Sequence, residues 1–103
     1  MSDQALLSEV HRRLAGMPNL VRLVAFGSRA RGGARPDSDL DLMVVLNERG
    51  SLAERGRRVY RRLLDLPVAV DLVIYTPEEH DRLRSFLSTV AGIAEQEGKV
   101  LVG

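Results

Sequence analysis

The sequence predicts an α/β (α+β) fold, a small mixed sheet with helices packed on one face of it. Helical and strand periodicities alternate along the chain in the order helix, strand, strand, helix, strand, helix, which is typical of that class. The chain has 103 residues, of which 45% are hydrophobic and 28% are charged. That length and balance are those of one globular domain. We therefore expect residues 1–103 to form a single domain.

An N-terminal helix precedes the first two strands. It is expected over residues 3–15, because apolar residues recur there at helical spacing, namely Leu6, Leu7, Val10 and Leu14. Gly16 ends this helix. Residues 20–26 and 39–46 are predicted strands, and a turn rich in glycine and arginine connects them over residues 27–38.

The next helix begins with a capping box formed by Ser51 and Glu54. It is expected to run to Pro67 on an apolar stripe of Val59, Leu63 and Leu66. A third strand is predicted over residues 68–75, since this segment is almost continuously apolar and β-branched.

The C-terminal part combines a further helix with a short strand. Thr76 and Pro77 provide an N-cap and a proline at the first helical position. The helix should reach about residue 97, either unbroken or as two helices with a break near residues 85–88. Residues 99–102 are expected to add a short strand.

Charge and composition exclude several classes of protein. The net charge is +1, so direct binding of nucleic acid is not expected. No apolar run approaches the roughly 18 residues that span a bilayer, and the N-terminus lacks a signal peptide, so we expect a cytoplasmic protein with no membrane partner. Cysteine is absent, which excludes disulfides and thiolate zinc sites. His11 and His80 are interpreted as surface residues.

Aspartates interrupt two otherwise apolar strands. Asp39 and Asp41 are two residues apart, so on a strand both side chains project from one face. The opposite face of this strand should pack on helices through Leu40, Leu42, Val44 and Leu46. Asp71 interrupts the third strand in the same way. If the two strands are neighbours, three carboxylates converge on the uncovered face of the sheet.

Each acidic motif also has a plain structural explanation. An isolated Asp-x-Asp is typical of a turn, and Asp71 alone is typical of the polar side of a sheet. Together, however, clustered carboxylates repel one another, a cost that a bound Mg²⁺ would reverse. Two such ions can hold the attacking and leaving oxygens of a phosphoryl displacement. The combination indicates metal-dependent phosphoryl chemistry.

A Gly-Ser turn follows the first strand. Gly27 has no Cβ, so a phosphate can approach its backbone, and Ser28 offers a hydroxyl beside N–H groups that form an anion-binding concavity. The loop is surrounded by Arg29, Arg31 and Arg35. Taken alone, the segment is more typical of an ordinary glycine-rich turn, so its interpretation depends on the aspartates.

The spacing of the two motifs resembles a known family. Residues 27–32 read Gly-Ser-Arg-Ala-Arg-Gly, residues 38–42 read Ser-Asp-Leu-Asp-Leu, and ten residues separate Ser28 from Asp39. The pattern resembles the nucleotidyltransferase superfamily that includes DNA polymerase β, and more closely its minimal nucleotidyltransferases (MNT). The resemblance covers about residues 20–75 and the tail.

The resemblance implies a role for each matching residue. Nucleotide binding would fall to Gly27, Ser28 and Arg31. Metal binding and catalysis would fall to Asp39, Asp41 and Asp71. The substrate would be ATP with two Mg²⁺ ions, and AMP would pass to a hydroxyl with release of pyrophosphate. Many MNT proteins are antitoxins of HEPN-type ribonuclease toxins and some adenylylate a toxin tyrosine, so the resemblance implies an antitoxin of that kind.

Two classes of function remain open. The protein is either a protein adenylyltransferase whose acceptor comes from a partner, or a non-catalytic nucleotide-binding antitoxin that neutralises the toxin by binding. The aspartates favour the enzyme, since a binding module has no need of mutually repelling carboxylates. Modification of a small molecule is disfavoured by the short chain. The arginine-rich segment of residues 55–62 is either a solvated helix face or a contact for a partner or RNA.

Overall fold

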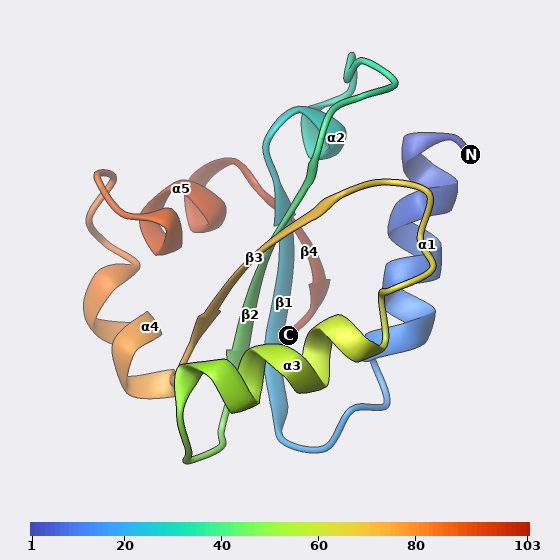
Figure 1. The fold of residues 1–103 in the computed structure, drawn as a ribbon. Coiled ribbons are helices and arrows are strands. Elements are labelled where there is room, and N and C mark those ends of the chain that lie inside the picture. Colours follow the sequence, from blue (N-terminus) through green and yellow to red (C-terminus); the bar gives the residue numbers. More distant parts are fainter.

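A computed structural model describes all of residues 1–103 as five helices and four strands (Figure 1). In chain order these are α1 (Asp3–Leu14), β1 (Leu20–Phe26), α2 (Ser28–Arg31), β2 (Leu40–Leu46), α3 (Leu52–Arg61), β3 (Val70–Tyr75), α4 (Pro77–Leu83), α5 (Val90–Glu97) and β4 (Lys99–Val102). The strands form one sheet in the order β3-β2-β1-β4. β1 is antiparallel to β2 and β4, whereas β2 and β3 are parallel. The predicted mixed sheet is confirmed.

Most boundaries follow the capping signals. Thr76 and the side chain three positions later make both bonds of a capping box at the start of α4. The break predicted near residues 85–88 separates α4 from α5, and the predicted C-terminal strand pairs with β1 as β4. The helix predicted to reach Pro67 ends at Arg61 instead. Turns with hydrogen bonds to the residue three positions earlier replace it and carry Leu63 and Leu66 into the core.

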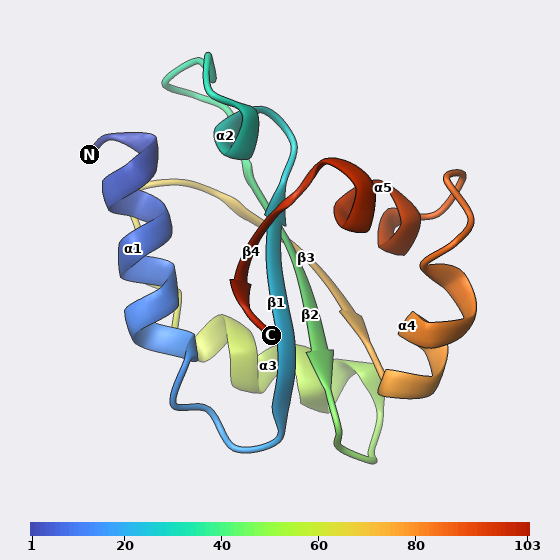
Figure 2. The same cartoon turned by 180° about the vertical axis from the view of Figure 1, so that it is seen from behind.

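Helices cover both faces of the sheet, which corrects the expectation that they lie on one face. The larger apolar cluster joins α1 and α3 to the leucine face of β2. A second cluster joins Val24, Met43 and Val45 to Ala91 and Ala94 of α5. In Figures 1 and 2, α5 and α1 lie on opposite sides of the sheet. Met43 and Val45 explain the difference, because a strand that is apolar on both faces is buried on both.

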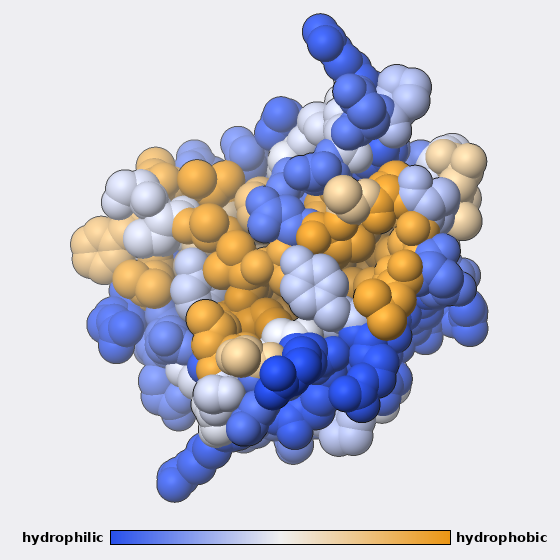
Figure 3. Space-filling model, viewed as in Figure 1, coloured by the Kyte–Doolittle hydropathy of each residue, from blue (hydrophilic) through white to orange (hydrophobic).

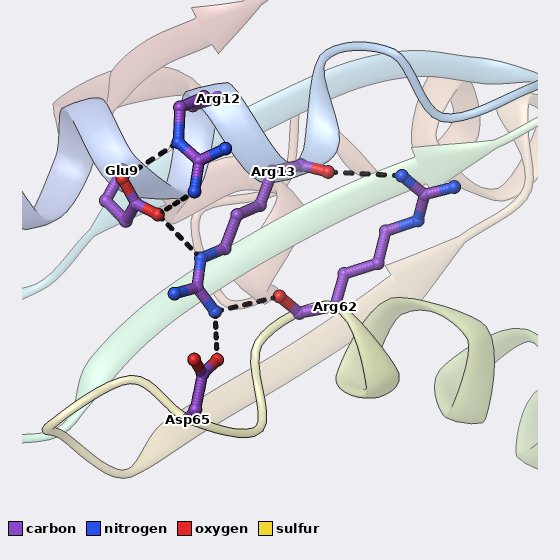
Figure 4. Close-up of polar contacts among 5 residues, drawn as sticks. All are labelled: Glu9, Arg12, Arg13, Arg62 and Asp65. Atoms are coloured by element: carbon purple, nitrogen blue, oxygen red, sulfur yellow. Dashed lines mark hydrogen bonds and ion pairs between the residues drawn. The ribbon is translucent and has the colours of Figure 1, made fainter.

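A polar network holds α1 against the turn that follows α3 (Figure 4). Arg13 Nη1 donates to the Arg62 carbonyl at 3.1 Å, and Arg62 Nη1 donates to the Arg13 carbonyl at 3.3 Å. Arg13 also pairs with Asp65 and with Glu9. Hydrogen bonds from Arg12 and Arg13 lower the pKa of Glu9 to about 2. Part of the arginine-rich segment therefore joins two helices.

None of the helices is both long enough and apolar enough to cross a membrane.

Candidate active site

The aspartates of the two parallel strands lie side by side. Asp41 and Asp71 are the second residues of β2 and β3, and the parallel register pairs them directly. Asp39 precedes β2, so it lies just outside the strand in which it was predicted, and it is exposed. β1 brings its last residue, Phe26, opposite Asp41. β2 and β3 are therefore neighbours, as the predicted convergence of the three carboxylates requires.

The carboxylates face the side of the sheet that α4 and α5 cover only in part. By strand alternation Asp41 shares its face with Met43 and Val45, which are fully buried. Asp39 and Asp71 are nevertheless exposed. The arginine-rich α3 packs on the opposite face through the larger cluster. It therefore does not cover the carboxylates, and the site is open at the end of the sheet next to α2.

Negative side chains surround Asp41. Partial burial raises the pKa of Asp41, and the charges of Asp71 and Asp39 raise it further, whereas Arg31 acts in the opposite direction. The influences of Asp71, Asp39 and Arg31 are Coulombic and fall off with distance. All four side chains therefore belong to one electrostatic cluster.

The chemistry of this cluster fits a hard divalent cation. Carboxylate oxygens are the ligands that Mg²⁺ prefers, and the repulsion that raises the pKa of Asp41 is what a cation would relieve. In their present rotamers, no group of three or more His, Asp or Glu side chains is arranged to hold a metal ion. Mg²⁺ is often held by one or two carboxylates together with substrate phosphates and water.

The backbone of Gly27 lies close to the carboxylate of Asp41. Its φ is +74°, and a Cβ built on it would lie 2.2 Å from Asp41 Oδ2. Its carbonyl accepts from the N–H groups of Ala30 and Arg31, which begins the single turn of α2. Glycine is therefore required here by its dihedral angles and by the neighbouring carboxylate. The sequence indicated a close approach by phosphate but not this contact.

The other residues of the Gly-Ser turn take different positions. Ser28 opens α2 and is half-buried. Arg31 is exposed, donates to Glu97 Oε1 at 3.4 Å and lies within electrostatic reach of Asp41. Arg35 is exposed, but Arg29 is buried and does not line the surface of the loop.

Arg29 instead holds the turn to the start of β2. Its Nε donates to the carbonyl of Ser38 at 2.9 Å and its Nη2 to that of Pro36 at 3.1 Å. Its Nη1 donates to Asp3 Oδ1 at 3.0 Å, which joins the turn to the first residue of α1. Arg29 thereby fixes the segment that leads directly into Asp39. In the sequence it is indistinguishable from the exposed arginines around it, so its role was missed.

Replacing Arg29 with Met is expected to destabilise the fold by about 3 kcal/mol, because Asp3 and the carbonyls of Pro36 and Ser38 lose the donor that the buried guanidinium provides. Urea unfolding of the purified proteins measures this difference. Arg35→Met is the matched control, since Arg35 is exposed and should change the free energy of unfolding by less than about 0.5 kcal/mol. Equal effects of the two substitutions would show that Arg29 does not organise the loop.

A sheet that brings a Gly-Ser turn and facing carboxylates to the same end is suited to moving phosphoryl or nucleotidyl groups. Sequence comparison gives the same class, with a match to the nucleotidyltransferase domain over residues 6–101. The chain belongs to the nucleotidyltransferase domain family. The family resemblance drawn from the Gly-Ser and Asp-x-Asp motifs is thus confirmed at this level.

Several solved structures share the fold. One is a chain of the complex between tri-AMPylated Shewanella oneidensis HEPN toxin and MNT antitoxin, with a TM-score of 0.64 and 22% identity, covering 98% of this chain and 72% of that one. Another is from a toxin–antitoxin structure with AMP-PNP, with a TM-score of 0.65 and 23% identity, covering 100% and 74%. A third, from the toxin–antitoxin pair MntA-HepT, has a TM-score of 0.62 and 23% identity, covering 97% and 72%. No curated protein matches the sequence.

Proposed function

We propose that this nucleotidyltransferase is a metal-dependent protein adenylyltransferase that acts as an antitoxin by transferring AMP from ATP to a hydroxyl of a HEPN-type toxin. The observation that carries the proposal is the direct pairing of Asp41 with Asp71 beside Gly27. The MNT antitoxin complex that shares the fold contains a tri-AMPylated HEPN toxin, which supports a HEPN-type toxin as the acceptor. Another similar structure contains AMP-PNP, which supports ATP as the nucleotide substrate.

Each site residue has one task in this proposal. The turn of Gly27 and Ser28 binds the triphosphate, and Arg31 adds a positive charge beside it. The metal ions are held by Asp39, Asp41 and Asp71. When bound, Mg²⁺ supplies charge stabilisation to the phosphate oxygens.

The reaction joins the acceptor oxygen to the α-phosphorus of ATP. The bond from that phosphorus to the bridging oxygen of pyrophosphate breaks, and pyrophosphate leaves. Asp71 lies on the exposed side of the cluster, where it can accept the proton of the attacking hydroxyl. We expect the acceptor to be a tyrosine, whose long side chain can bring its hydroxyl to an open site.

The open site also explains why a partner must bring the acceptor. Asp39 and Asp71 are exposed, so no segment of residues 1–103 holds an acceptor over them. Catalysis of group transfer depends on holding both reactants in attack geometry. A protein that docks over the open end of the sheet would supply both the hydroxyl and its orientation.

ATP is expected to bind only when Mg²⁺ is present, because triphosphate and carboxylates would otherwise repel each other. Isothermal titration of ATP into the protein, with Mg²⁺ and with EDTA, tests this expectation. Titration of Mg²⁺ into the Asp39→Asn variant provides a control for metal bound elsewhere. Equal affinity for ATP in both conditions would rule out a metal-dependent site.

The intact mass of the toxin tests the proposed reaction. The cognate HEPN-type toxin is incubated with ATP, Mg²⁺ and either the wild type or the Asp41→Asn variant. Addition of AMP by the wild type alone, with parallel loss of ribonuclease activity, is the expected result. If neither protein changes the toxin mass and both still neutralise it, the protein is an antitoxin that acts by binding.

A further inference from the structure

A groove of about 640 Å³ follows the free edge of β3, between α3 and the start of α4. It extends along β3 from Leu72 to Tyr75, away from the end of the strand that carries Asp71. Leu52 and Tyr60 of α3 line it although they are 61% and 39% exposed. Figure 3 shows apolar surface gathered across this side of the molecule, with hydrophilic surface along its lower border.

The main chain along this groove lacks a strand partner. β3 is at the edge of the sheet. The Ala69 carbonyl faces β2, where it accepts from Leu40 N, so by alternation the main-chain groups of Leu72 and Ile74 face outward. Further along the same edge, the Val70 carbonyl accepts from the Tyr60 hydroxyl at 3.0 Å. An unpaired edge of this kind is a template for another strand.

Arg55 lies in the groove, where its guanidinium forms a long ion pair with Glu79. The residue is 8% exposed, and its buried Nε and Nη1 make no hydrogen bond. Glu79 Oε1 is 4.0 Å from Nη1, too far for a hydrogen bond, and it already accepts from Thr76 N at 2.8 Å. A buried charge without hydrogen bonds costs free energy that an acceptor would recover. Arg57 also lines the groove, so an acidic partner is favoured.

We propose that this groove is a docking site for an extended acidic segment of a partner protein, which pairs with the edge of β3 and places a carboxylate on Arg55. The outward groups of Leu72 and Ile74 are two residues apart, which matches the repeat of a bound strand. Apolar side chains on either side of the acidic residue would lie against Leu52 and Tyr60. A carboxylate satisfies a guanidinium with charge-assisted hydrogen bonds. The proposal does not depend on nucleotidyl transfer.

A library of random 12-residue peptides displayed on phage, selected on the wild-type protein, tests the proposal. Selected peptides should carry an acidic residue flanked by apolar residues. The synthetic form of the most enriched peptide should bind wild type at least about tenfold more tightly than Arg55→Met, since hydrogen bonds to a charged group are lost. Arg61→Met, which removes a charge from the same helix outside the groove, should bind like wild type. The amides of Leu72 and Ile74 should exchange more slowly with the peptide bound.

Several outcomes would overturn this proposal. One is a selection that gives no acidic consensus, and another is a peptide that binds Arg55→Met as tightly as wild type. If the wild type forms a dimer in sedimentation that Arg55→Met dissociates, a second copy of the chain is the occupant instead. Should Arg55→Met fail to fold, the peptide with its acidic residue changed to the amide is compared on wild type. Equal affinity of the two peptides there would also contradict the proposal.

Discussion

Asp41→Asn is expected to lower the rate of AMP transfer by about a thousandfold or more, while the protein stays folded. Loss of a group that stabilises charge in the transition state has effects of this size. The Asp41 side chain belongs to neither apolar cluster, so its replacement leaves no cavity. Transfer of labelled AMP to the toxin measures the rate, and thermal unfolding measures the stability. A large fall in melting temperature would indicate a structural role instead.

The same substitution should raise stability at neutral pH. Burial and the neighbouring carboxylates raise the pKa of Asp41 in the folded protein, so the folded state holds this proton more tightly than the unfolded chain. As pH rises between the ordinary and the raised pKa, the unfolded chain loses its proton first, and stability falls. The gain from Asp41→Asn should therefore be present at pH 7, shrink as pH falls through the raised pKa of Asp41, and be lost below the ordinary value of 3.8. Asp37→Asn, which removes one exposed carboxylate outside the cluster, is the matched control for the loss of a negative charge.

Gly27→Ala is expected to impair transfer by about a hundredfold, the size of effect that a displacement of about 1 Å produces at a reacting centre. The added methyl would lie 2.2 Å from Asp41 Oδ2. The alanine backbone would also have to adopt a φ of +74°. Gly32→Ala is a matched control, because Gly32 has a φ of +86° but no heavy atom within 4 Å of its Cβ position. Both variants carry backbone strain, and only one displaces the carboxylate. The ratio of their transfer rates isolates the contact, and a ratio near one would show that it is unimportant.

Strand alternation predicted a good part of the site. Asp41 and Asp71 each stand at a polar position between core residues, and that pattern is local to each strand. Their direct register also depends on which strands pair, and this arises from packing between distant segments. The prediction of one covered face failed because the leucine face of β2 was weighed and Met43 and Val45 were not.

Arginine was the residue type whose positions could not be predicted. Arg29 and Arg55 are buried, whereas Arg31 and Arg57 are exposed. Arg29 is buried among acceptors that tertiary structure brings to it, such as the carbonyl of Ser38, whereas the buried Nε and Nη1 of Arg55 have no hydrogen bond. Nothing in the sequence near either residue reveals these surroundings. A sequence pattern can therefore place an aspartate on a strand face more readily than it can place an arginine inside a loop.

The pairing of Asp41 with Asp71 also bears on how accurately the chain folds. A slip of one residue by β2 or β3 turns every side chain of that strand to the other face of the sheet. Such a slip would drive a carboxylate among the leucines of the larger cluster, at a cost of several kcal/mol for each unpaired charge. The aspartates that repel each other in the native state therefore penalise misaligned sheets even more strongly. We therefore expect Asp41 and Asp71 also to disfavour a misaligned register of β2 and β3.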